Sequence, residues 1–136
     1  MNVTFYFFIS AKGFGLTEKN SLSNKLKFTQ INLRPPRFCE NLSNKTLEID
    51  AERSLCGVGR LTNSGVRRDS CQNDSGGPLV AKVLNESNEE KYTLVGIVSN
   101  GAGPRDFGKF SSCGLFGIYT KVSKYLNFIR DPVHFY

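Results

Sequence analysis

The chain has 136 residues, of which 39% are hydrophobic, and carries a formal net charge of +6 at pH 7. This length allows one domain with a buried core, and no apolar run is long enough to span a membrane. The positive charge is scattered in runs of at most two basic residues, which is typical of a solvated surface rather than of nucleic-acid binding. We therefore expect a single domain, residues 1–136, with neither nucleic acid nor a membrane as partner.

The first predicted element is the apolar stretch from Met1 to Ile9, which is rich in aromatic and β-branched residues. It lacks the positive start, the apolar length and the small-residue cleavage site of a secretory signal, so we expect a buried strand. Gly13-Phe14-Gly15 predicts a turn. Residues 26–33 then alternate between apolar and polar with an imperfect register, at Leu26, Phe28, Gln30 or Ile31, and Leu33. This pattern predicts a strand that ends at Pro35-Pro36.

The middle of the chain predicts one irregular segment and three strands. Cys39 is expected in a short helical or irregular segment that continues to Ala51, and residues 54–58 predict the next strand. Residues 78–84 and 92–99 predict a hairpin, because two apolar runs flank a charged tip that suits a solvated turn.

The end of the chain predicts a last strand and a helix. Residues 116–120 are β-prone, and apolar residues then recur at helical spacing in residues 123–130 and just before them. The residues on this apolar face are Val122, Tyr125, Leu126 and Ile129. We therefore expect a mostly β fold that ends in an amphipathic helix packed on the strands.

Four cysteines in so short a chain indicate an oxidising compartment, and three pairings are arithmetically possible. The sequence separations of 17, 15 and 42 residues contain no Cys-x-x-Cys pair, and no histidine lies nearby. Disulfides are therefore favoured over a zinc site. We expect no metal and no other cofactor.

A candidate nucleophile lies in the run Asp69-Ser70-Cys71-Gln72-Asn73-Asp74-Ser75-Gly76-Gly77-Pro78-Leu79-Val80. Two glycines directly after Ser75 allow a tight bend that leaves its hydroxyl unobstructed. In such a turn the backbone N–H groups of Asn73 and Ser75 can point at an oxygen that becomes negative, worth roughly 3–4 kcal/mol per donor. The alternative is a Gly/Pro surface turn without chemistry.

This run resembles the nucleophile loop of a trypsin-like serine protease of the chymotrypsin family. Residues 9–15 are similar to the strand and turn of that family that read Gly-Trp-Gly, and the likeness continues to about Arg130. The resemblance covers only the second half of a protease. It implies the second antiparallel β-barrel of the two-barrel chymotrypsin-like fold, with a C-terminal helix, and a serine endopeptidase activity on protein or peptide substrates.

The resemblance also implies a specificity pocket that accepts Arg or Lys. Asp69 lies six residues before Ser75, where trypsin-like members carry the acid at the pocket floor. Without this register, Asp69 would be interpreted as a solvated carboxylate beside Arg67 and Arg68. The implied pocket walls and substrate-binding positions are Ser99, Asn100, Gly101 and Gly117.

The same resemblance implies two disulfides and one ion pair. It selects the disulfides Cys39–Cys56 and Cys71–Cys113, and it pairs Asp74 with a terminal amine that activation cleavage releases. Because that amine lies outside this chain, we expect Asp74 to be solvated or protonated and its loop to be loosely held.

Ser75 requires a general base, and no residue of this sequence matches the catalytic histidine of the family. The only histidine, His134, lies near the C-terminus and is expected in an exposed tail, whereas the family carries its catalytic histidine and aspartate in the first barrel. We expect the chain alone to be inactive, and its further partners to be the missing N-terminal protease half or a protein inhibitor. The parent protein is expected to be secreted, with an export signal upstream.

Three departures from the family pattern support a different function. Asn73 replaces a glycine, Asn100 replaces an aromatic residue, and residues 102–112 form a longer connection than usual. The alternative is a non-catalytic homologue that acts as a binding or regulatory module. A third, weaker interpretation is an unrelated basic secreted domain held by disulfides.

Overall fold

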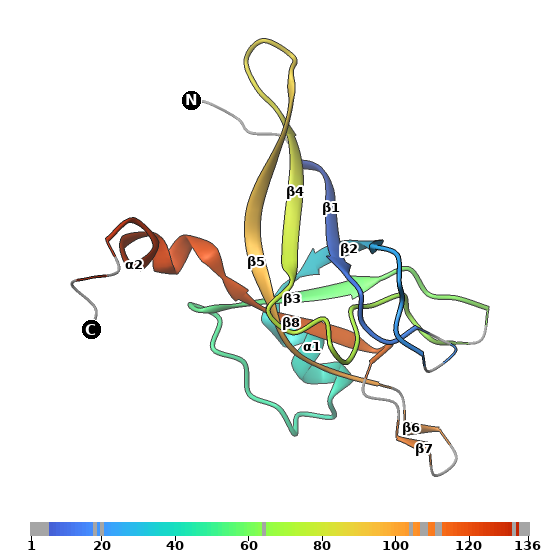
Figure 1. Cartoon of the computed structure of the whole chain (residues 1–136). Helices are drawn as coiled ribbons and strands as arrows, with labels where there is room; N and C mark the ends of the chain where they lie inside the picture. Colours follow the sequence, from blue (N-terminus) through green and yellow to red (C-terminus); the bar gives the residue numbers. More distant parts are fainter. Residues whose placement is uncertain are drawn as a thin grey trace.

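The computed structural model describes residues 6–17, 19, 21–63, 65–103, 105–106, 109–110, 113–131 and 133. Six antiparallel strands close into a barrel in the order β1-β2-β3-β8-β5-β4 (Figure 1). The strands are β1 Tyr6–Gly13, β2 Lys27–Arg34, β3 Ser54–Gly59, β4 Pro78–Leu84, β5 Glu90–Ala102 and β8 Phe116–Lys121. The prediction of a mostly β chain forming an antiparallel barrel is confirmed.

The alternation of side chains along the strands builds the barrel interior. In β4 every second residue is buried, so Leu79, Ala81 and Val83 point inward. Leu79 packs with Ala11 of β1 and Tyr119 of β8 in the cluster that fills the barrel. Burying such side chains removes apolar surface from water at about 25 cal/mol per Å², which is the main force that closes the sheet.

A second cluster lies outside the barrel, beneath α1 Pro36–Leu42. The helix begins at a proline, whose fixed φ suits the first helical position. Cys39 of this helix is fully buried and forms a disulfide with Cys56 of β3. Cys39 packs with Ile49, Val58, Phe116 and Ile118, so the segment after Pro35 covers β3 and β8.

The strand predicted at residues 26–33 corresponds to β2, and its imperfect alternation has a structural reason. Of the apolar residues in residues 26–33, Ile31 is 2% exposed, whereas Phe28 is 67% exposed and Leu26 and Leu33 also lie at the surface. Ile31 packs in the barrel cluster, and alternation then turns Phe28 outward. The apolar residues of this strand therefore do not share one face.

The C-terminal helix exists but does not pack as predicted. A 3₁₀ turn, η1 Val122–Tyr125, leads into α2 Leu126–Arg130, which extends away from the barrel (Figure 1). Tyr125, Leu126 and Ile129 remain exposed, with Ile129 at 54%. The helical periodicity correctly indicated an apolar face, but periodicity alone does not say which surface covers it.

The remaining elements are a two-stranded ribbon, β6 Arg105–Asp106 and β7 Lys109–Phe110, within the long connection before β8. In the described part of the chain, no helix combines the length and the hydropathy that crossing a bilayer requires.

Candidate functional site

Ser75 lies at the end of a tight turn that leads into β4. Asn73 has a φ of 69° and Gly76 a φ of 82°, so the chain enters the left-handed region on both sides of Asp74 and Ser75. Asparagine tolerates this region better than other non-glycine residues, and the turn survives the replacement of glycine at position 73. Hydrogen bonds from Gly76 N to Val98 O and from Val98 N to Gly77 O, both 2.9 Å, fix the turn to β5. Ser75 itself is exposed.

The backbone N–H groups of Asn73 and Ser75 form no hydrogen bond with another residue that the structure describes. Both residues are exposed. By contrast, the neighbouring Asp74 N–H donates to the Cys71 carbonyl at 3.0 Å and the Gly77 N–H donates to the Asp74 carbonyl at 2.8 Å. The two N–H groups predicted to stabilise an oxyanion are thus among those of the turn that have no partner in the described residues.

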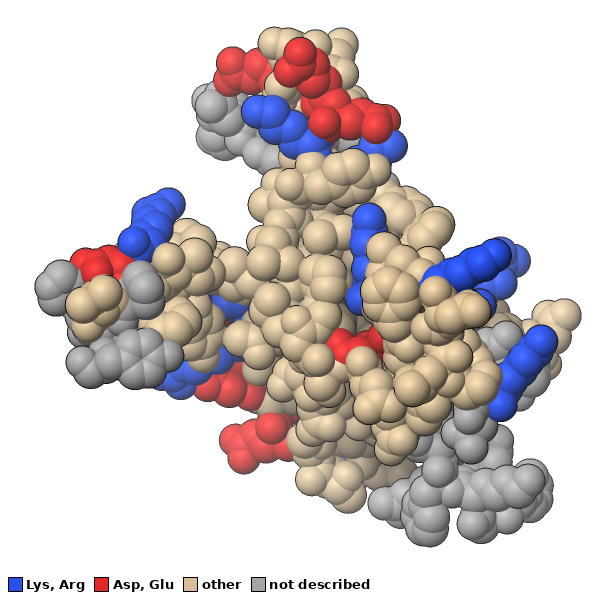
Figure 2. Space-filling model, in the orientation of Figure 1, with Lys and Arg blue, Asp and Glu red and all other residues tan. Residues whose placement is uncertain are grey.

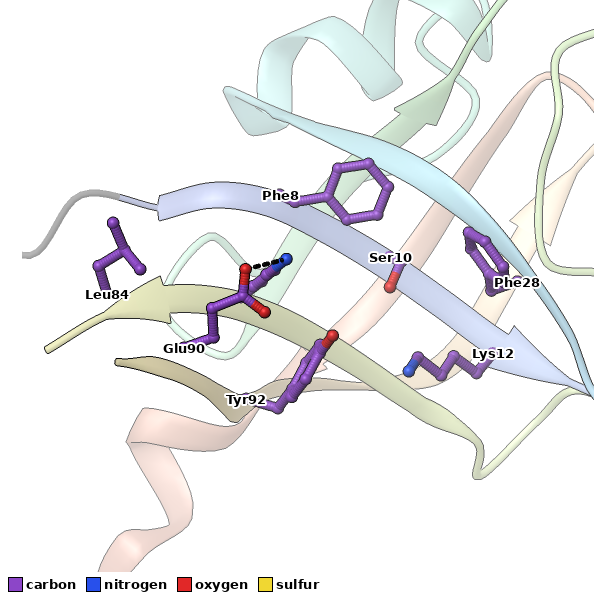
Figure 3. A pocket seen from close by; sticks show the side chains of 8 residues that line it. Phe8, Ser10, Lys12, Phe28, Leu84, Glu90 and Tyr92 are labelled. Carbon is purple, nitrogen blue, oxygen red and sulfur yellow. Dashed lines mark ion pairs between the residues drawn. The ribbon is translucent and has the colours of Figure 1, made fainter. Parts of the chain in front are cut away.

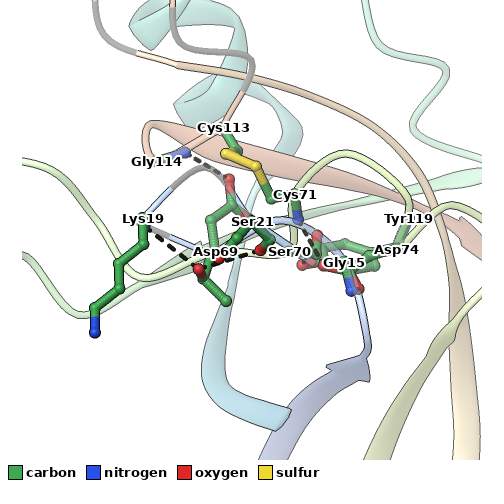
Figure 4. The surroundings of a disulfide bond; sticks show 11 residues. Gly15, Lys19, Ser21, Asp69, Ser70, Cys71, Asp74, Cys113, Gly114 and Tyr119 are labelled. Carbon is green, nitrogen blue, oxygen red and sulfur yellow. Dashed lines mark hydrogen bonds between the residues drawn. A yellow bond between two sulfur atoms is a disulfide. The ribbon is translucent and has the colours of Figure 1, made fainter. Parts of the chain in front are cut away.

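The Asp74 carboxylate turns away from the Ser75 side and is half-buried. Its Oδ1 accepts a hydrogen bond from Gly15 N at 2.8 Å, and its Oδ2 accepts one from Cys71 N at 2.9 Å (Figure 4). The expectation of a solvated carboxylate in a loose loop is therefore wrong. Two backbone N–H groups, which leave no trace in the sequence, take the place of a charged partner.

Gly13 and Gly15 make room for this carboxylate. A Cβ on Gly15 would lie 2.5 Å from Asp74 Cγ and 2.6 Å from the Gln72 carbonyl oxygen, and a Cβ on Gly13 would overlap Asp74 Oδ1. The turn after β1 thus approaches the nucleophile turn too closely for any side chain. This contact explains the Gly-Phe-Gly sequence by packing rather than by backbone conformation.

Asp69 is largely buried at the start of the same loop. Its Oδ2 accepts a hydrogen bond from Gly114 N at 3.1 Å, whereas Oδ1 is buried without a hydrogen-bond partner among the described residues. Burial raises the pKa of Asp69 to about 7, and interactions with the Gly114 N–H and with the backbone and hydroxyl of Ser70 oppose this shift. An oxygen in this state would gain strongly from a cationic partner.

Gly117 of β8 lies directly against Asp69. A Cβ at this glycine would stand 3.1 Å from Asp69 Oδ1 and 2.9 Å from Tyr119 Oη. Ser70 Oγ and Tyr119 Oη lie 3.3 Å apart and form a hydrogen bond, and burial raises the pKa of Tyr119. The resemblance implied a pocket wall at residues 117–120, which includes Tyr119, whereas Ser70 was not predicted for this site. The two-residue separation of Gly117 and Tyr119 places both on one face of the strand.

The strand β5 supplies the opposite side of this region. Gly101 pairs with Gly117 and Asn100 pairs with Ile118, after an irregularity at Ser99. A Cβ on Gly101 would stand 2.9 Å from the Phe116 carbonyl oxygen, so the glycine is required by close backbone approach. Ser99 and Asn100 are exposed. The structure therefore brings Gly101 and Gly117 together beside Asp69, with Ser99 and Asn100 at the surface.

The disulfide Cys71–Cys113 joins the nucleophile loop to the segment that precedes β8, with a Cα–Cα distance of 5.2 Å (Figure 4). Together with Cys39–Cys56 it gives the pairing that the resemblance implied. His134 lies outside the described residues. Among the described residues, no group of His, Cys, Asp and Glu side chains is arranged to hold a metal ion.

An aromatic groove of about 580 Å³ lies elsewhere, on the outer side of β1, β2, β4 and β5 (Figure 3). Phe28 and Tyr92, at 67% and 63% exposed, stand on its sides. Lys12 Nζ lies 5.1 Å from the centre of the Tyr92 ring, and the pair Lys82–Glu90, 2.6 Å apart, crosses one end. Neither Asp69 nor Ser75 lines this groove, so it is a separate feature from the candidate site.

Comparison with known proteins identifies the family. The model of the trypsin family matches residues 8–129. Tissue-type plasminogen activator from Rattus norvegicus is 38% identical over 127 residues, which cover 88% of this chain and 20% of that protein. Vitamin K-dependent protein C from Oryctolagus cuniculus is 37% identical over 119 residues, covering 85% and 22%. Serine protease ea from Drosophila melanogaster is 36% identical over 125 residues, covering 89% and 28%.

The chain therefore belongs to the trypsin family of serine proteases. It spans about a fifth of the length of the tissue-type plasminogen activators that it matches.

Proposed function

We propose that this chain is the C-terminal barrel of a secreted, trypsin-like serine endopeptidase that cleaves after Arg or Lys. Ser75 is the nucleophile, Asn73 and Ser75 supply the oxyanion N–H groups, and Asp69 selects the cationic side chain. The observation that carries this proposal is the Asp69 carboxylate, whose Oδ1 is buried and has no hydrogen bond of acceptable geometry within the described part of the chain.

The chemistry of Asp69 favours a long cationic side chain. A guanidinium or ammonium group that reaches Oδ1 would satisfy a buried acceptor and neutralise a buried charge. An apolar substrate side chain would leave both unpaired, which disfavours it. Gly117 keeps the approach to Oδ1 free, because a Cβ there would stand 3.1 Å from this oxygen.

The chemistry of Ser75 requires a base, and the part of the chain that the structure describes contains no histidine to supply it. The turn exposes the hydroxyl and leaves two N–H donors for the charge that develops on an attacked carbonyl. Loss of triad members lowers turnover by about 10⁴- to 10⁶-fold. We therefore propose that activity requires a second protease half that carries the histidine and aspartate, and that the chain alone does not hydrolyse peptides.

Asp74 fits the role of an activation-linked carboxylate. Each of its oxygens accepts one backbone N–H, from Gly15 and from Cys71. A carboxylate oxygen has lone pairs for more than one donor, so Asp74 retains capacity for a terminal ammonium group. Its pairing with such an amine belongs to this proposal.

The test of the specificity site is binding of an aromatic amidine to the purified chain. p-Aminobenzamidine fluoresces more strongly in an apolar environment, and we expect a saturable increase that Asp69→Asn abolishes. Asp50→Asn is the matched control, because Asp50 is an exposed carboxylate whose contacts are with its sequence neighbours Glu52 and Arg53. Equal binding by both variants would contradict the assignment of Asp69.

A second candidate function is a non-catalytic homologue that binds or regulates a partner. The aromatic groove favours it, because Phe28 and Tyr92 expose large apolar surfaces there. Hydrolysis of an Arg-containing ester by the intact secreted gene product separates the two functions. Activity that Ser75→Ala removes supports the endopeptidase, whereas tight binding of a protein without cleavage supports the binding module.

A further inference from the structure

The segment between β3 and Asp69 forms a small hairpin of its own. Leu61 forms an antiparallel bridge with Arg67. On either side of this bridge, Arg68 N donates to Arg60 O and Thr62 N donates to Val66 O, both at 2.9 Å. Arg60 and Arg68 are therefore directly opposite each other across the hairpin.

This arrangement starts two arginine side chains from opposite positions on one face of the hairpin. Residues directly opposite in an antiparallel pair have Cβ atoms about 5 Å apart, and like charges there are destabilising. Neither the Arg60 nor the Arg68 guanidinium makes an ion pair or a hydrogen bond with another described residue. Arg67 differs, because its side chain donates to the Gly59 carbonyl at 3.1 Å.

The two arginines line a hollow of about 240 Å³ together with Leu61, Thr62 and Asn63. Figure 2 shows basic side chains on the side of the molecule where this hairpin projects in Figure 1, and no acidic ones beside them. An anion entering the hollow would relieve the repulsion between the arginines.

The hairpin is held in place from its base. Arg67 N donates to Gly114 O at 2.7 Å, and the Arg68 carbonyl packs so closely on Gly59 that a Cβ there would overlap it. The backbone that carries the arginines is thus fixed before any ligand arrives, which reduces the entropy lost on binding.

We propose that Arg60 and Arg68 form an anion-binding site for the carboxylate of an acidic side chain in a protein partner. The planar fork of a guanidinium matches a carboxylate with two parallel hydrogen bonds. A long polyanion such as nucleic acid or a sulfated polysaccharide is recognised by an extended basic stripe, whereas this hollow has two arginines. The site is separate from the candidate catalytic chemistry, and its function does not depend on proteolysis.

The test is binding of a fluorescein-labelled tetraglutamate peptide to the chain, followed by fluorescence anisotropy at physiological salt. The double variant Arg60→Gln/Arg68→Gln is expected to weaken binding by about tenfold or more, since two charge-assisted contacts are lost. The control Arg37→Gln/Arg130→Gln removes the same charge from two exposed residues elsewhere and is expected to change binding less than about twofold.

The same protein preparations test whether the double variants fold and which class of ligand the site binds. The two arginines carry like charges at opposite positions of the hairpin. Their replacement in Arg60→Gln/Arg68→Gln should therefore leave the melting temperature unchanged or raised. Equal loss of binding in both double variants would overturn the proposal, because net charge alone would then explain the affinity. Equal binding of a tetraglutamine peptide, or binding of heparin without binding of tetraglutamate, would also overturn it.

Discussion

The Asp74 carboxylate and the Gly15 backbone N–H are joined by a hydrogen bond of 2.8 Å across 59 residues of sequence. This bond connects the nucleophile turn to the turn that follows β1. The second oxygen of Asp74 accepts the Cys71 N–H, next to the disulfide that holds the other end of the loop. The orientation of Ser75 therefore depends on a carboxylate that points away from it.

Replacement of Asp74 by alanine should destabilise the fold. Two N–H groups in a part-buried region would lose a charged acceptor, and we expect the free energy of unfolding to fall by about 2–4 kcal/mol. Urea denaturation measures this change. Glu48→Ala is the control, because Glu48 is exposed, and an equal effect of the two substitutions would refute the structural role of Asp74.

Replacement of Gly15 by alanine should be costly for a different reason. The added Cβ would lie 2.5 Å from Asp74 Cγ, so the two turns must separate, and we expect a loss of about 3 kcal/mol. Gly65→Ala is the matched substitution. No atom lies within 4 Å of its Cβ, and only its φ of 80° opposes alanine, at about 1 kcal/mol. A larger loss for Gly65→Ala in thermal unfolding would show that the close contact at Gly15 is absent.

The titration of Asp69 predicts a pH dependence of stability. Its folded pKa of about 7 exceeds its ordinary value of 3.8, so between these values the folded state binds more protons than the unfolded state. The contribution of this carboxyl to the free energy of unfolding is therefore greatest below pH 4. It falls as the pH rises to 7, by about 4 kcal/mol at most, and stays low above pH 7.

Asp69→Asn should remove this part of the pH dependence. We expect the variant to gain stability relative to the unmodified chain at pH 8 and to gain little at pH 4. Urea titrations at the two pH values measure the difference. A variant whose advantage is the same at pH 4 and pH 8 would show that Asp69 ionises normally in the folded protein.

Replacement of Gly117 by alanine should close the approach to Asp69. The new methyl group would stand 3.1 Å from Oδ1, in the space that a cationic ligand would need. We expect the affinity for p-aminobenzamidine to fall by about tenfold or more, because the amidinium can no longer reach the carboxylate. Gly65→Ala, in an exposed loop, should bind normally. Unchanged binding by Gly117→Ala would place the amidine elsewhere.

The strands were largely predictable because alternation and turn residues are local signals, whereas their closure into a barrel was implied by the family resemblance. The strands at residues 54–58, 78–84 and 116–120 lie within the observed β3, β4 and β8. The hairpin tip is shorter than predicted, because β5 already begins at Glu90. The pattern in β2 could not decide which face is buried, because the register of a strand depends on its partner strands.

The candidate site was predictable only in part. Ser75 and Asp69 could be named from one contiguous motif, and Gly101 and Gly117 from two later stretches that resemble the pocket walls of the family. The partners of Asp74 could not, because backbone N–H groups carry no residue identity. The pairing of Arg60 with Arg68 was also not predicted, because it depends on the register of a hairpin for which the sequence gives no clear signal.

The central claim is that this chain carries a nucleophile and a specificity acid without the base that activates the nucleophile. The most direct measurement is the rate at which a fluorophosphonate labels Ser75 in the purified chain, located by mass spectrometry of tryptic peptides. We predict that Ser75 reacts no faster than Ser87, which is exposed at the β4–β5 hairpin tip. Rapid, stoichiometric labelling that Ser75→Ala abolishes would contradict the claim.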